Sequence, residues 1–165
     1  MSTIITNKGL LKVKSLTVPS DWFENGNVKE LEAELLETMN EQEKKNNRRP
    51  LGLSAVQIGK AYQLCVVTTI GKFTKTIINP AILEELGLPH INFETCLSFP
   101  GECFMTTRYD KIKVRYLDGK GKVHTKIFRG LLARQLQHEV DHMNGVIPTK
   151  EQFKSGNNYV KNRRK

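Results

Sequence analysis

The order of apolar and polar residues along the chain predicts two long helices. In the range 27–45, apolar residues recur at helical spacing on one face, and glutamates occupy most of the remaining positions. Asn27 is a plausible N-cap for this first helix, because Glu30 follows three residues later. The second helical pattern covers residues 131–144, and Gly145 fits the cap at its C-terminal end.

Shorter patterns between these two helices predict strands. Four stretches have an apolar or alternating character: 63–70, 74–79, 111–117 and 123–128. The third stretch alternates apolar and charged residues, which is typical of a half-buried antiparallel strand, and a hairpin turn follows at residues 118–121. Residues 80–92 have a mixed pattern that favours no element. We therefore expect an α+β fold, with antiparallel sheets packed around the later helix and the N-terminal helix beside them.

Length and composition predict one domain followed by a tail. The chain has 165 residues, of which 38% are hydrophobic and 26% charged, and this is enough for one hydrophobic core. We expect a single domain at residues 1–150 and a short basic tail at residues 151–165. No apolar run approaches the roughly 18 residues of a transmembrane helix, and the N-terminus lacks a signal-peptide pattern. A cytoplasmic location without membrane contact is therefore expected.

Cysteine usage and charge narrow the classes of function. Three cysteines, an odd number, argue against a disulfide framework, and Cys65 is expected in the core because it lies in an apolar stretch. The formal net charge is +9, and part of it is concentrated in residues 44–49 and 161–165. No aromatic residues interleave with these runs, so a solvated surface is favoured over contact with a polyanion such as RNA.

The later helix carries the strongest chemical signal, an H-E-x-x-H motif. His138 and His142 are four residues apart, so they stand about 40° apart on one helix face and can bind one metal ion. Glu139 is rotated about 100° from His138, which places it beside the ion as a base for an activated water. The opposite face is apolar and consists of Leu132, Leu136, Val140 and Met143. Ligands on one side and apolar residues on the other predict a central helix.

A catalytic site of this kind needs a third protein ligand, and each candidate indicates a different class of enzyme. One group of metalloproteases continues the motif to a third histidine, but Pro148 occupies that position here. A second group uses a glutamate on a later helix, and only Glu151 follows, too close and in no helical pattern. Upstream, Cys96 offers a soft thiolate ligand, with Cys103 as its competitor.

Three motifs resemble those of the peptide deformylase family. The family's G-φ-G-φ-A-A-x-Q motif is matched by LGLSAVQ at residues 51–57, and its E-G-C-L-S motif by ETCLS at residues 94–98. Its Q-H-E-x-D-H-x-x-G motif is matched fully by residues 137–145. The resemblance covers roughly residues 1–148 in layout. It implies a metal-dependent hydrolase that removes the N-formyl group from the N-terminal formylmethionine of newly made polypeptides and releases formate.

The resemblance also implies roles for individual residues. The metal ligands would be Cys96, His138 and His142. The ion would be Fe²⁺, as in most of the family, with Zn²⁺, Ni²⁺ or Co²⁺ as substitutes. Glu139 would transfer the proton, while the Gln57 side-chain amide and the Leu97 backbone N–H would donate hydrogen bonds to the oxyanion. The substrate-binding residues would be Leu51, Gly52, Thr95 and Leu131.

The chain departs from the family pattern near the expected substrate site. Pro50, Ser54 and Thr95 replace the residues that the first two motifs normally carry. These departures affect contacts with the substrate backbone and the shape of the cysteine loop, not the metal ligands. Arg134 and Gln135 stand where the family lines its methionine pocket with apolar residues. We expect the Arg134 side chain to bend away to solvent.

The sequence also predicts which residues support the site, how long the chain is relative to the family, and what the protein binds. Glu94 is expected to pair with Arg108, and Asp141 to support the site without binding the ion. The chain looks like a shortened form of the family, of a kind that viruses encode. We expect a monomer that binds N-formylmethionyl peptides and whose basic tail contacts the ribosome or the nascent chain.

Two other functions stay open on the sequence alone. The same helix would serve a metallopeptidase, which would cleave unformylated peptides internally. A non-enzymatic basic protein with a structural metal site would instead bind RNA through its tail, with strong salt dependence.

Overall fold

The computed structural model describes residues 3–68 and 73–148. Its elements, in chain order, are α1 (Lys8–Leu11), α2 (Trp22–Asn25), α3 (Asn27–Asn46), β1 (Gly52–Ser54), the 3-10 helix η1 (Ala55–Ile58), β2 (Leu64–Thr68), β3 (Thr74–Cys96), β4 (Phe99–Leu117), β5 (Val123–Arg129) and α4 (Gly130–Met143). The strands form one antiparallel sheet in the order β1-β2-β3-β4-β5, so the expected α+β class is confirmed. Within the described part of the chain, no helix is both long and apolar enough to cross a membrane. The predicted tail at residues 151–165 lies outside the described residues.

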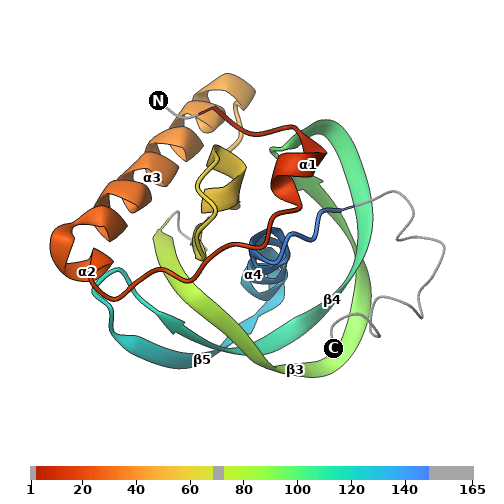
Figure 1. The fold of residues 1–165 in the computed structure, drawn as a ribbon. Coiled ribbons are helices and arrows are strands. Elements are labelled where there is room, and N and C mark those ends of the chain that lie inside the picture. Colours follow the sequence, from red (N-terminus) through yellow and green to blue (C-terminus); the bar gives the residue numbers. More distant parts are fainter. Residues whose placement is uncertain (1–2, 69–72, 149–165) are drawn as a thin grey trace.

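The helix α4 lies at the centre of the molecule, and the long strands β3 and β4 curve around it (Figure 1). The pairing of β3 with β4 changes register at four places, between Ile78 and Ala81, between Ile82 and Glu84, between Leu86 and Pro89, and between Thr95 and Cys96. Each extra residue bends the strand locally, as β-bulges do. The register shifts in the β3–β4 pairing therefore explain why the sheet curves around α4.

The two long strands extend much further than the sequence predicted. We expected strands at residues 74–79 and 111–117, whereas β3 continues to residue 96 and β4 begins at residue 99. The ambiguous residues 80–92 belong to β3. Proline and glycine at positions 80, 87 and 89 hide the alternating pattern there; positions 80 and 87 lie inside register shifts, and Pro89 is the first paired residue after one.

The strand β2 is buried on both faces, which explains its unbroken apolar sequence. Leu64 and Val66 pack in the core that the apolar face of α3 covers. Cys65 and Val67 point the other way, into the core beneath α4. The predicted core position of Cys65 is therefore confirmed, and β2 separates the two helices as a shared layer.

The start of α3 differs from the prediction that Asn27 caps the helix. Gly26 occupies the capping position with a positive φ of 92°, and no side chain caps the helix. The carbonyl of Gly26 accepts the hydrogen bond from the Glu30 backbone N–H. Helix α2 ends at the same glycine, so a tight corner between two helices replaces the expected capping box.

The end of α4 is a glycine cap, as the sequence predicted. Gly145 has a φ of +72°, its N–H donates to the carbonyl of His142 (3.0 Å), and the Val146 N–H donates to the carbonyl of Asp141 (2.8 Å). This is the Schellman pairing of a helix C-terminus. A Cβ at position 145 would stand 2.6 Å from the carbonyl oxygen of Lys12. The N-terminal segment therefore packs against the cap of the central helix.

We predict that Gly145→Ala lowers the free energy of unfolding by more than about 1 kcal/mol, because it adds a steric clash to the cost of a positive φ. Urea unfolding followed by circular dichroism measures the change. Gly87→Ala is the matched control, since Gly87 has a φ of +80° but nothing within 4 Å of an added Cβ. Equal losses in the two variants would contradict a role for the Lys12 contact.

Candidate metal centre

The two histidines of α4 and one cysteine of β3 converge on a single point. The Nε2 atoms of His138 and His142 are 3.2 Å apart, and the Sγ atom of Cys96 lies 3.2 Å from Nε2 of His142. All three ligand atoms lie within 4.8 Å of one another. Cys103, the competitor considered above, is exposed and pairs with Thr95 across the two strands. The structure thus brings Cys96, and not Cys103, to the histidines.

The chemistry of these three side chains fits a borderline or soft divalent cation. Thiolate and imidazole are the ligands that Fe²⁺, Zn²⁺, Ni²⁺ and Co²⁺ bind in proteins. Burial lowers the pKa of His142 to about 3, so its ring is neutral and ready to bind. Burial opposes protonation of His138 as well, but hydrogen bonds with Cys96 and Glu94 and the charge of Glu139 raise its pKa to about 10. Binding of a cation would therefore release a proton from this ring.

A buried charge network holds His138 in place. Nδ1 of His138 donates to a carboxylate oxygen of Glu94 (3.0 Å), and Arg108 donates to the same carboxylate twice, at 2.8 and 2.9 Å. Arg108 also donates to Asp141 on α4. Burial opposes ionisation of Glu94, but the hydrogen bonds from Arg108 and His138 outweigh it and hold its pKa well below the usual range. The expected Glu94–Arg108 pair is confirmed, and Asp141 binds Arg108 from the helix side.

Glu139 stands beside the ligand cluster in a tight enclosure. Its side chain is buried, and Oε2 has no hydrogen-bond partner among the described residues. Burial raises the pKa of Glu139 to about 7, although the charge of His138 opposes the shift. A Cβ on Gly52 would stand 2.6 Å from Oε1 of Glu139. The glycine at the start of β1 is thus required for the close approach of strand and carboxylate.

Gln57 has two structural roles at once. Its Oε1 accepts hydrogen bonds from the backbone N–H and the hydroxyl of Ser54, which forms a capping box at the start of η1. Its Nε2 donates to Sγ of Cys96 (3.4 Å) and to Oγ of Ser98 (3.1 Å). The amide therefore reaches the ligand cluster even though it also caps a helix. Ser98 was not singled out in the sequence, although it belongs to the same motif as Cys96.

The remaining predicted site residues line one cleft of about 1020 Å³ that also reaches Cys96, His138 and Glu139. These cleft residues are Leu51, Gly52, Gln57, Thr95, Leu97 and Leu131. Thr95 lies in the strand β3. Its φ is not positive, because the only described non-glycine residues with positive φ are Asn47 and Asn79. Threonine at this position therefore causes no positive-φ strain.

The prediction for Arg134 is wrong. Its side chain lines the cleft instead of bending away to solvent, and Nη1 donates to Oδ1 of Asn92 on β3. Asn92 is in turn fixed by donating to the carbonyl of His90 (2.9 Å). The sequence contained no sign of Asn92, because its strand was not recognised. The neighbouring Gln135 is buried, so both polar departures on α4 face inward.

Residues 4–157 match the family model described as polypeptide deformylase. The chain belongs to this family. Peptide deformylase 1 of Bacillus anthracis is 48% identical over 101 residues, which are 60% of this chain and 64% of that protein. Peptide deformylase 1 of Clostridium perfringens is 38% identical over 124 residues, 74% of this chain and 80% of that protein. The alignment with the Bacillus cereus protein also covers 64% of that relative's length.

Solved deformylase structures share the fold over most of the chain. A Met-Ala-Ser-bound class I type b peptide deformylase from Acinetobacter baumannii superposes with a TM-score of 0.80 at 26% identity, covering 89% of this chain and 96% of that one. A probable peptide deformylase from Synechococcus phage S-SSM7 gives a TM-score of 0.78 at 30% identity, covering 89% and 97%. Deformylases are metal-dependent, which agrees with the cysteine and histidine cluster found here.

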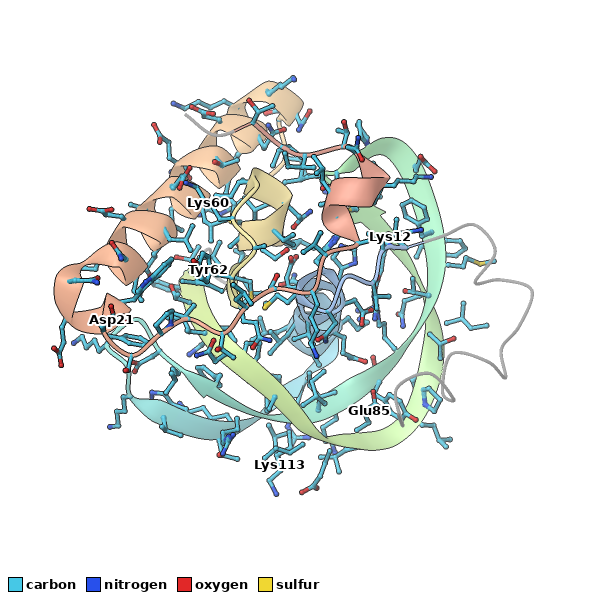
Figure 2. All side chains as sticks on the ribbon, in the orientation of Figure 1. Lys12, Asp21, Lys60, Tyr62, Glu85 and Lys113 are labelled. Atoms are coloured by element: carbon cyan, nitrogen blue, oxygen red, sulfur yellow. The ribbon has the colours of Figure 1, made fainter. Side chains whose placement is uncertain are left out.

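We predict that Glu94→Gln weakens metal binding about 10- to 100-fold, because the residue behind a histidine ligand orients its ring. Titration with Co²⁺, followed by the thiolate absorption band, measures the affinity. Glu84→Gln is the matched control, since Glu84 also lies on β3 and pairs at 2.7 Å with Lys113, whose side chain lies on the outer side of the sheet, away from α4 (Figure 2). Equal affinities in the Glu94→Gln variant and the unaltered protein would contradict the orienting role.

Proposed function

We propose that this protein is a metal-dependent peptide deformylase, which hydrolyses the N-formyl group of N-terminal formylmethionine on newly made polypeptides and releases formate. The observation that carries the proposal is the cluster of Cys96, His138 and His142, whose first two members line one cleft together with Glu139, in a member of this family. The cleft is large enough for the first residues of a peptide, since small-molecule sites typically enclose about 300–1,000 Å³.

The ligand set supports a divalent ion held by one thiolate and two imidazoles. We propose Fe²⁺ as the native ion, with Zn²⁺, Ni²⁺ or Co²⁺ as substitutes, because all of them accept this donor set. When bound, the ion polarises the attacking water and lowers its pKa. Cys96 and His138 line the cleft, so a substrate can reach this point.

Glu139 is proposed to move the proton. It takes the proton of the attacking water and then gives it to the amine that leaves the formyl group. A base that also returns a proton works best with a pKa near the working pH, and burial places the pKa of Glu139 at about 7. The close contact with Gly52 fixes the carboxylate at the cleft wall.

Gln57 and Leu97 are proposed to stabilise the oxygen that becomes negative during attack. Nε2 of Gln57 already points at Cys96, and Leu97 is the next residue along the chain, so both donors stand at the ligand cluster. Loss of one such donor typically costs about 10²–10³ in rate. Leu51, Gly52, Thr95 and Leu131 are proposed to bind the substrate around this point.

The proposal also covers the domain organisation, the oligomeric state and the location of the enzyme. We propose that residues 1–150 form one catalytic domain, that the protein acts as a monomer, and that it works in the cytoplasm, where polypeptides are made. The basic tail at residues 151–165 is proposed to contact the ribosome or nascent chain. Unchanged ribosome binding after deletion of residues 157–165 would remove the last proposal.

Formate release tests the function directly. Protein prepared without oxygen is incubated with formyl-Met-Ala-Ser, and formate and metal content are measured on the same sample. Hydrolysis of the formyl group is expected, without cleavage of the unformylated peptide. Cleavage inside unformylated peptides would indicate a metallopeptidase instead.

We predict that Glu139→Gln keeps its metal and loses turnover by about 10²–10⁴, because an amide cannot accept the proton. Formate release together with metal analysis separates the two effects. An active variant would contradict the role of Glu139.

We predict that Gly52→Ala lowers the rate by about 10², because the new methyl group must displace the Glu139 carboxylate, and a 1 Å shift has this cost. The same formate assay applies. Gly101→Ala provides the control for strain without a steric contact, since Gly101 lines the same cleft and has a φ of +77°, but nothing lies within 4 Å of an added Cβ. Similar losses in both variants would contradict the specific contact.

A further inference from the structure

We propose that the cleft selects formylated peptides that carry acidic side chains shortly after the N-terminal methionine. The selecting residues are Lys45, Arg48 and Arg49, here called the cationic rim. All three line the same cleft as the metal ligands, at the end of α3 and in the loop that follows it. The inference rests on the proposed deformylase function and adds a substrate class to it.

The charge of the cationic rim is largely uncompensated. Arg49 is half-buried and pairs with Glu43 at 2.8 Å. Lys45 and Arg48 are exposed, and neither has an ion pair within residues 3–68 and 73–148. Among the described residues, the cleft has one acidic side chain besides Glu94 and Glu139, namely that of Glu41. A peptide in this part of the cleft therefore meets an excess of positive charge.

Stabilisation of α3 explains only part of this pattern. Lysines in the last turn of a helix interact favourably with its dipole, and Lys44 and Lys45 both occupy that turn. Arg48 and Arg49 lie beyond the helix, so the dipole does not account for them. The dipole also does not account for the difference between the two lysines, since Lys45 lines the cleft and Lys44 does not.

The chemistry of the substrate directs the attraction to its side chains. A formylated N-terminus has no positive charge, and a polypeptide that continues beyond the cleft has no carboxylate terminus there. Side chains are then the only charges that the cationic rim can attract. Carboxylates are favoured, and lysine or arginine side chains are disfavoured.

The position of the rim indicates which substrate residues it meets. Arg48 precedes Gly52 by four residues, so their backbones are at most about 14 Å apart. Gly52 contacts the catalytic Glu139, which marks the place of the formyl group. An extended peptide covers the same distance in about four residues. We therefore expect the selection to act on the second to fourth residues after methionine.

Peptide kinetics test the inference. The substrates are formyl-Met-Ala-Ser-Glu-Glu, the matching Gln-Gln peptide and the matching Lys-Lys peptide, all with amidated C-termini. One exposed ion pair changes affinity by up to about fivefold, so kcat/KM is expected to fall about 10-fold from the acidic to the basic peptide at low salt. The ratio should approach one at high salt, since the pairs are exposed. Equal values for the three peptides at low salt would overturn the inference and leave the proposed function intact.

Charge reversal separates the rim from the overall charge of the protein. The double variant Lys45→Glu/Arg48→Glu is expected to invert the order of the acidic and basic peptides. Lys44→Glu is the matched control for the single variant Lys45→Glu, because both change the net charge equally and Lys44 lies on the same helix turn outside the cleft; Lys45→Glu should lower the preference for the acidic peptide and Lys44→Glu should keep it. A reversal at Lys44 that shifts the ratio as much as the reversal at Lys45 would assign the effect to net charge and overturn the inference.

Binding provides a readout that does not depend on turnover. Anisotropy of fluorescently labelled forms of the same peptides, bound to the Glu139→Gln variant, should show the same order of affinities. If the unaltered protein hydrolyses none of the peptides, the proposed function fails, while binding still decides the preference. Single-stranded RNA that binds through Lys45 and Arg48, without any preference for acidic peptides, would assign the rim to a polyanion and overturn the inference.

Discussion

The buried ion cluster around Arg108 is the constraint on which the metal centre depends. One guanidinium from β4 binds Glu94 of β3 and Asp141 of α4, and Glu94 binds the ring of His138. Removing one partner from such a cluster typically costs about 3–5 kcal/mol, because the other charges stay buried. The cluster therefore fixes the central helix relative to both long strands at the place where the ligands must meet.

The fold meets this constraint by enclosing α4 in a curved sheet. The apolar face of the helix packs on β2, β3 and β4, and its polar face carries the ligands and Glu139. The short strand β1 closes the polar side, and Gly52 allows its backbone to touch Glu139. Burial of this carboxylate raises its pKa to about 7. The enclosure of Glu139 thus affects both the shape of the cleft and the proton affinity of this carboxylate.

Polar side chains form part of the cleft wall. Arg134 and Asn92 form a hydrogen-bonded pair across α4 and β3, at a place where apolar residues were expected from the family. Cations from α3 and its following loop face the same cavity. These residues lie outside the three motifs, so they alter what the cleft contacts without changing the ligand set.

The sequence by itself determined the elements with a strong period and the residues with an unusual spacing. The helices at residues 27–45 and 131–144, the two histidines and Glu139 were all recognisable, because helical geometry relates neighbours in sequence to one face. Cys96 and the Glu94–Arg108 pair were found through motif resemblance. The full lengths of β3 and β4 were not recognisable, because bulges at proline and glycine interrupt their alternation.

Tertiary structure alone decided the contacts between distant segments. The inward position of Arg134, its contact with Asn92 and the approach of Gly52 to Glu139 all depend on how the sheet curves around α4. That curvature comes from register shifts between strands, and a register is a property of two paired segments. No single stretch of sequence contains it.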